Sequence, residues 1–157
     1  MRHRIVEIGS FDAVGLRTEC PGGDTNSIGQ LWDDFFGKDC REVAGSQGIV
    51  GVSWGDGTGG FSYMAAHKLP AGSGHAAAAA AQYESRAVPG GKYVGVQWAG
   101  KGGPEMSSAF MDIFQRVIPE VGLQVHPEGC CIEDYPNEGA YDEATGTLRA
   151  ELLVRVQ

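Results

Sequence analysis

The first half of the chain alternates between hydrophobic and polar positions in a way that predicts one strand, one helix and two further strands. An extended segment covers residues 5–17, and Gly37 stops the helix that follows it. The apolar residues of that helix recur at helical spacing on one face: Ile28, Leu31, Trp32 and Phe35. Strands are then predicted over 48–54 and 60–68, joined by a glycine-rich turn.

The second half repeats this order of elements. Extended segments over 83–88 and 92–99 precede a helix that Pro119 ends, and strands follow over 129–135 and 147–156. The apolar stripe of this helix comprises Met106, Phe110, Ile113, Phe114 and Val117. The two halves also share a short echo, in which Ala-Val-Gly-Leu around Gly15 corresponds to Tyr-Val-Gly-Val around Gly95.

The repetition predicts an α+β fold made of two pseudo-symmetric β-α-β-β repeats with mainly antiparallel sheets. We expect a single domain over 1–157, with repeat 1 at about 1–69, a Gly-, Ser- and Ala-rich linker over 70–82, and repeat 2 at about 83–157. If each helix covers one face of its sheet, the helices lie outside and the uncovered faces meet along a central ligand groove.

Strand alternation predicts which acidic residues face this groove. Even-numbered positions of the last strand, from Leu148 to Val156, share the helix-covered face, so Glu151 points to the groove. We assign the same groove-facing orientation to Glu133 and Tyr135, and to Phe61 with Tyr63. A carboxylate among aromatic and aliphatic residues is costly to bury unless a positive group meets it. The alternative is that both acids are solvated, or are paired with Arg149 or Arg155.

Composition narrows the class of partner. The net charge of −8 and the pI near 4.9 argue against nucleic-acid binding and favour cationic small molecules. No segment resembles a signal peptide or a membrane span, and the four cysteines lack zinc or redox spacing, so we expect a cytoplasmic protein with reduced thiols. We expect no cofactor and no metal site, because the histidines have no ligand partner at metal spacing. No serine or cysteine has a convincing base arrangement for nucleophilic catalysis.

Several segments together resemble the GyrI-like domains, the effector-binding domains of AraC-type and MerR-type transcription regulators. The opening Ile5 to Leu16, the hairpin ending in Phe61 and Tyr63, and the stretch Tyr83 to Val94 correspond to the family in order and spacing. The closing Glu133-Asp134-Tyr135 and the last strand complete the resemblance over nearly the whole chain.

The resemblance implies a pocket that binds hydrophobic, often cationic, drug-like compounds for sensing or sequestration. Its acid is Glu133 or Glu151, and both alternatives stay open. The other expected ligand-binding residues are aromatic: Tyr135, Tyr63, Phe61, Trp54, Trp98, Tyr93 and Phe11. An aromatic face attracts a cation by roughly 0.5–2 kcal/mol, which agrees with this expectation.

Two other functions are compatible with the resemblance. Some GyrI-like proteins hydrolyse reactive small molecules, which would make Glu133 or Glu151 a general base. Another member inhibits a topoisomerase, which would make the acidic surface a protein-interaction module. The chain lacks a helix-turn-helix and a basic face, so direct DNA recognition is not expected, and either a monomer or a homodimer is compatible with the sequence.

Overall fold

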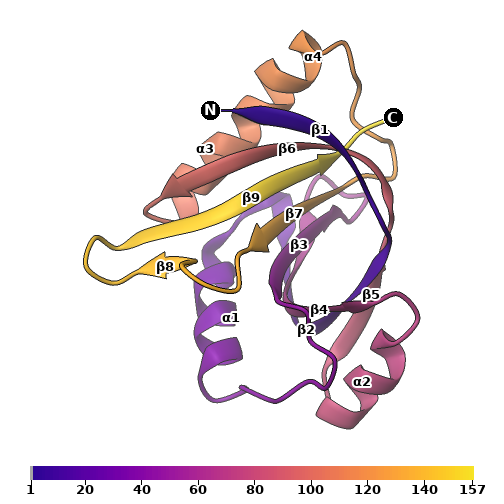
Figure 1. Cartoon of the computed structure of the whole chain (residues 1–157), viewed down its shortest axis with the longest axis vertical. Helices are drawn as coiled ribbons and strands as arrows, with labels where there is room; N and C mark the ends of the chain where they lie inside the picture. Colours follow the sequence, from indigo (N-terminus) through magenta and orange to yellow (C-terminus); the bar gives the residue numbers. More distant parts are fainter. Residues whose placement is uncertain (1) are drawn as a thin grey trace. The chain divides into compact units, whose positions relative to one another are not determined.

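The computed structural model describes residues 2–157, and its contacts divide the chain into two compact units (Figure 1). Unit 1 contains the chain up to Ile8 together with Gly91–Gln157, and unit 2 is Gly9–Gly90. Each unit joins antiparallel strands to at least one helix, which confirms the predicted α+β class.

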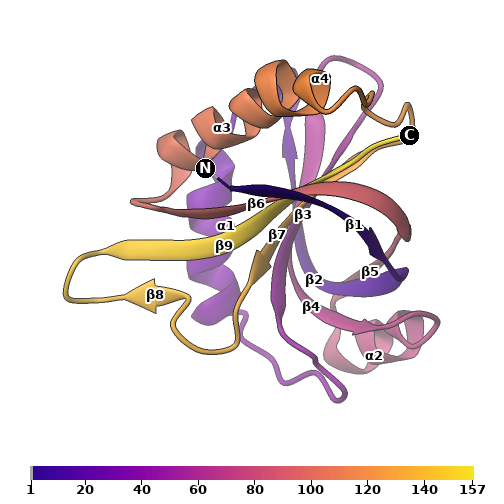
Figure 2. The same cartoon turned by 45° about the horizontal axis from the view of Figure 1, so that its top comes forward.

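Unit 1 is an antiparallel sheet with a long helical segment on one face (Figures 1 and 2). Its strands lie in the order β1 (His3–Ile8), β6 (Gly91–Gly100), β9 (Thr147–Arg155) and β7 (Cys130–Tyr135), and β8 (Tyr141–Asp142) pairs with β9. The helical segment comprises α3 (Gly103–Asp112), a π-helical turn (Ile113–Val117) and α4 (Ile118–Glu120). The segment thus passes through Pro119, which was expected to end it. A proline in a final turn removes few intrahelical hydrogen bonds.

The core of unit 1 lies between α3 and the sheet. Met106, Ile113 and Val117 of the helical segment contact Leu152 and Val154 of β9 in one buried cluster. Ala150 and Val156 belong to the same cluster and Leu148 packs against it, which confirms that the even-numbered face of β9 is covered by the helix.

Unit 2 joins four antiparallel strands to two helices. Its strands lie in the order β3 (Ile49–Gly55), β4 (Phe61–Pro70), β2 (Phe11–Cys20) and β5 (Glu84–Val88). The remaining elements are α1 (Asn26–Phe36), α2 (Gly74–Ala81) and a short 3₁₀ turn (Pro21–Gly23). Leu31 and Phe35 of α1 and Ala78 of α2 pack against Val14, Ala65 and Leu69 of the sheet.

The strand pairings cross the boundary that was placed between the repeats. The extended segment predicted over 5–17 divides into β1 and β2, and β1 pairs with β6 of unit 1. Conversely, β5 pairs with β2 of unit 2, and α2 occupies most of the span expected to be a linker. Contacts therefore divide the chain after Ile8 and after Gly90, whereas the repeat limits drawn from the sequence stay a prediction.

Candidate functional site

Glu133 is a buried carboxylate in the middle of β7. Only 8% of the residue is exposed. Among the residues that the structure describes, the buried polar or charged ones are Ser62 and Glu133. Tyr135, two residues further along the same strand, donates a hydrogen bond of 2.6 Å from its hydroxyl to Glu133 Oε1. Burying a carboxylate is costly without such partners, so Glu133 is a candidate functional residue.

The strand register places Glu133 on the helix-covered face of unit 1. Glu133 lies opposite Leu152, and directly opposed residues of antiparallel strands share a face. Because Leu152 belongs to the cluster under α3, Glu133 points to the same side as that cluster. The predicted orientation, with Glu133 and Glu151 on one face away from the helix, is therefore wrong for Glu133 and for Tyr135. Alternation gives the face of a residue within its own strand, but the relation between strands depends on register.

Aromatic side chains accompany Glu133 on this face. Tyr135 packs against the cluster under α3, as do Phe110 of α3 and Phe114 of the π-helical turn. Burial raises the pKa of the Tyr135 phenol, and the negative charge of Glu133 and the hydrogen bond to it raise that pKa further. The Tyr135 phenol therefore stays protonated at physiological pH and can donate to Glu133.

Glu151 lies on the opposite face of the same sheet and already has a cationic partner. Arg4 of β1 binds its carboxylate through two hydrogen bonds, Nε to Oε2 at 2.7 Å and Nη2 to Oε1 at 2.6 Å. The hydrogen bond and the charge of Glu151 raise the pKa of Arg4, and Asp134 acts in the same direction. Pairing with arginine was an expected alternative, although Arg149 and Arg155 were the neighbours considered. A bidentate arginine neutralises the carboxylate and fixes its orientation.

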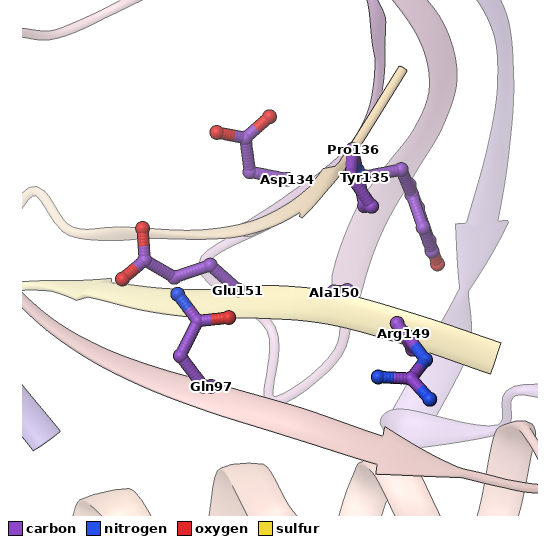
Figure 3. Close-up of a pocket in the computed structure, with 7 residues that line it drawn as sticks. All are labelled: Gln97, Asp134, Tyr135, Pro136, Arg149, Ala150 and Glu151. Atoms are coloured by element: carbon purple, nitrogen blue, oxygen red, sulfur yellow. The ribbon is translucent and has the colours of Figure 1, made fainter. Parts of the chain in front are cut away.

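Glu151 also lines a hollow of about 300 Å³ in unit 1 (Figure 3). Figure 3 shows Gln97, Asp134 and Glu151 on one side of this hollow and Tyr135 with Arg149 on the other. Gln97 and Asp134 are the cross-strand neighbours of Glu151 on β6 and β7. The hollow carries both signs of charge, and Tyr135, the hydrogen-bond donor to Glu133, is among the residues that line it.

The aromatic residues predicted from unit 2 separate onto two faces. Tyr63 belongs to the cluster beneath α1, and Phe61 packs against it, so both lie on the helix-covered face, contrary to the predicted orientation. Trp32 of α1 donates a hydrogen bond of 2.9 Å from Nε1 to the Tyr63 hydroxyl, and its ring stacks on Phe36. Trp32, expected only as a core residue of the helix, therefore belongs to an aromatic group that reaches the surface, because 63% of Phe36 is exposed.

Trp54 lies on the other face of unit 2, in contact with two guanidinium groups. It opposes Ser62 on β4, whose neighbour Tyr63 points to the helix-covered side. The guanidinium carbon of Arg86 lies 3.7 Å from the centroid of the Trp54 ring, and that of Arg17 lies 5.2 Å away. Protein cations thus already engage this ring.

The remaining predicted aromatic residues are buried in separate places. Trp98 belongs to the cluster under α3, whereas Phe11 of unit 2 lies beneath the Lys68 ammonium, which is 4.9 Å from its ring centroid. Tyr93 is fully buried, and its hydroxyl lies 3.1 Å from the Cys130 thiol. Within residues 2–157, no group of three or more His, Cys, Asp or Glu residues could hold a metal ion. None of the helices in this range has the length and apolar character of a membrane span.

Sequence reasoning missed Arg4, Trp32, Phe110 and Phe114 as parts of these sites. Arg4 and Glu151 are separated by 147 positions, and no local pattern links them. The other three belong to helical stripes, which ordinarily indicate core packing. The excess of aromatic residues in both stripes is the one feature that could have distinguished them.

Comparison with known proteins identifies the family. Residues 4–154 match the Cass2 family, described as integron-associated effector binding protein, and the chain therefore belongs to this family. The match confirms the resemblance to effector-binding domains and supports binding of a small-molecule effector. No curated protein matches the sequence.

Solved structures share the fold over the whole chain. The protein SAV2435 bound to tetraphenylphosphonium has a TM-score of 0.71 at 16% identity, over 100% of this chain and 94% of its own. A putative transcription regulation protein from Staphylococcus aureus has a TM-score of 0.70 at 17% identity, over 100% and 99%. An integron cassette protein from the mobile metagenome of Vibrio cholerae has a TM-score of 0.65 at 17% identity, over 99% and 95%.

Proposed function

We propose that this protein binds hydrophobic organic cations and that Glu133 is the acid that the positive charge approaches. The buried carboxylate of Glu133 carries the proposal, because burial strengthens its attraction to an incoming cation relative to an exposed acid. Sensing or sequestering such a compound is the role that an effector-binding protein would serve.

The contrast between the two candidate acids supports the choice of Glu133. Glu151 already holds a bidentate Arg4, and a ligand cation would have to displace that guanidinium. Glu133 is more deeply buried, lies on the face covered by α3, and accepts a hydrogen bond from the Tyr135 hydroxyl.

The aromatic and apolar surroundings of Glu133 indicate the kind of cation. A compact, strongly hydrated cation would lose its water shell on entering such an environment, whereas a cation shielded by aromatic groups would not. Tetraphenylphosphonium is a cation of this kind, and the protein SAV2435, which shares the fold, binds it. We therefore propose Tyr135 as a ligand contact, with Phe110 and Phe114 as apolar neighbours.

Calorimetric titration with two ligands of similar shape and opposite charge tests the proposal. Tetraphenylphosphonium should bind saturably to the unmodified protein, and tetraphenylborate should not. Glu133→Gln should weaken cation binding by about 10- to 100-fold, since it removes a partly desolvated attraction. Glu151→Gln should change it by less than about threefold, because that charge is already balanced by Arg4.

Circular dichroism and thermal unfolding of both variants provide the control for folding. Equal binding of the borate, or unchanged cation affinity in a folded Glu133→Gln protein, would exclude the proposed role of Glu133. Recovery of the bound compound at unchanged mass would distinguish binding from hydrolysis.

A further inference from the structure

A serine and a histidine form a hydrogen-bonded pair at one edge of unit 2. Ser46 Oγ lies 2.8 Å from His67 Nδ1, although 21 positions separate the two residues in the sequence. Ser46 is exposed in the connection between α1 and β3, and His67 is half-buried on β4. No sequence pattern predicts a base beside any serine, so the fold alone creates this pair.

The surroundings of His67 favour the neutral imidazole. Burial lowers the pKa of His67, while a hydrogen bond to the backbone of Arg41 acts in the opposite direction. The Ser46 hydroxyl lies 2.8 Å from Nδ1 and 3.4 Å from the Gly48 carbonyl oxygen, so the imidazole is its nearer partner. A neutral ring protonated on Nε2 presents the Nδ1 lone pair to this hydroxyl. This is the protonation state that a general base requires.

Aromatic packing and backbone pairing hold both members of the pair in place. The ring centroids of Phe35 and Tyr83 lie 5.2 Å and 6.4 Å from that of His67. Tyr83 also anchors the segment that carries the Arg41 carbonyl, since its hydroxyl donates to Asp39 O at 2.6 Å and accepts from Arg41 N at 3.0 Å.

The backbone next to each member of the pair is also connected. Gln47 N donates to Lys68 O at 2.8 Å, and Lys68 N donates to Gly48 O at 2.9 Å. These two bonds join the residues that follow Ser46 to the residue that follows His67, so the approach of the hydroxyl to the imidazole does not depend on a loose loop.

From this geometry we propose that Ser46 and His67 form a nucleophile and general base that hydrolyse small carboxylic esters with good leaving groups. Ser46 Oγ attacks the ester carbonyl carbon as its proton passes to His67 Nδ1. The carbon–oxygen bond to the leaving group then breaks, and that alcohol takes the proton from Nδ1. Water, deprotonated by the same nitrogen, releases the carboxylic acid and regenerates the serine.

Covalent labelling and ester turnover test this proposal on the full chain. A fluorophosphonate should add one equivalent to Ser46, located by peptide mass spectrometry, and 4-nitrophenyl acetate should be hydrolysed above the buffer rate. Ser46→Ala should abolish both, and His67→Gln should slow both by about 100-fold, the usual scale of general-base catalysis. Ser73→Ala is the matched control, since Ser73 is a half-buried serine whose hydroxyl donates to the Pro70 carbonyl oxygen at 2.6 Å.

The outcomes separate this proposal from effector binding. Ser46 is exposed, so Ser46→Ala should leave the thermal unfolding midpoint and tetraphenylphosphonium affinity unchanged while labelling is lost. Failure of the fluorophosphonate to label Ser46, labelling of another residue in its place, or equal turnover by the folded Ser46→Ala protein would overturn it.

Discussion

At the residue scale, the two acidic residues singled out by the sequence have opposite electrostatic situations. Glu151 is matched by the guanidinium of Arg4, whereas Glu133 is buried beside the Tyr135 hydroxyl. The first arrangement is a bidentate salt bridge between a half-exposed arginine and a carboxylate whose side chain is 10% exposed. The second is a buried carboxylate that accepts a tyrosine hydrogen bond, and buried ionisable groups of this kind concentrate at functional sites.

The hydrogen bond from Tyr135 should contribute measurably to the stability of the fold. Tyr135→Phe removes the donor at 2.6 Å from Glu133 Oε1, and we expect it to lower the free energy of unfolding by about 2 kcal/mol at neutral pH. Tyr141→Phe is the control, because that tyrosine is 59% exposed and its change should stay within about 0.5 kcal/mol.

A double-mutant cycle with Glu133→Gln, measured by urea unfolding, isolates the interaction between the two residues. A coupling energy of about 1–2 kcal/mol is expected for contacting partners. Additive effects of the two substitutions would show that the Tyr135 hydroxyl acts independently of Glu133.

The sequence identified these residues but not their orientation. Aliphatic and aromatic neighbours marked Glu133, Tyr135 and Glu151 as unusual, and alternation along β9 placed Glu151 on the uncovered face. The orientation of Glu133 depends on its pairing with Leu152, and a slip of one residue would reverse it. No local pattern encodes that register.

At the element scale, a glycine in the middle of β2 and another in the middle of β6 allow close approach of neighbouring strands. A Cβ at Gly15 of β2 would lie 2.0 Å from the carbonyl oxygen of Ala65, and one at Gly95 of β6 would lie 2.9 Å from Glu151 Oε2. These are the glycines of the short echo between the two halves, so the echo has a structural cause. The order of helices and strands was predictable because it rests on such local periodicity, whereas the π-helical turn at Ile113–Val117 was not.

Substitution of these glycines should destabilise the protein to different degrees. Gly15→Ala forces a Cβ against backbone atoms of β4, and we expect a loss of about 3 kcal/mol. Gly95→Ala meets the ends of the Glu151 and Leu153 side chains, which can move, so a loss of about 1 kcal/mol is expected.

Gly9→Ala serves as the control for both substitutions, because no atom lies within 4 Å of the added methyl group. Thermal and urea unfolding of the three variants measure the differences. A Gly15→Ala protein as stable as Gly9→Ala would mean that β2 and β4 can separate without cost at this point.

At the scale of the whole molecule, unit 1 is built from two separate pieces of the chain, whereas unit 2 is the continuous segment Gly9–Gly90. The first strand pairs with residues that follow Gly90, and β5 joins the strands that precede it. The repeated order of elements can be predicted from the sequence. The pairings of β1 with β6 and of β5 with β2 join segments that are distant in the sequence, and periodicity does not specify them. Composition was more informative at this scale, because the net charge of −8 attracts or repels every charged partner that approaches the protein.

This net charge should contribute a modest, screenable part of the affinity for cations. Raising the salt concentration from about 20 mM to about 300 mM should weaken tetraphenylphosphonium binding by about threefold, because only exposed charges are strongly screened. The neutral triphenylphosphine oxide should bind with an affinity that does not change over the same range. A loss of about 100-fold would instead mean that several exposed acids hold the cation, as in binding dominated by counterion release, and would argue against the buried Glu133 as its main partner.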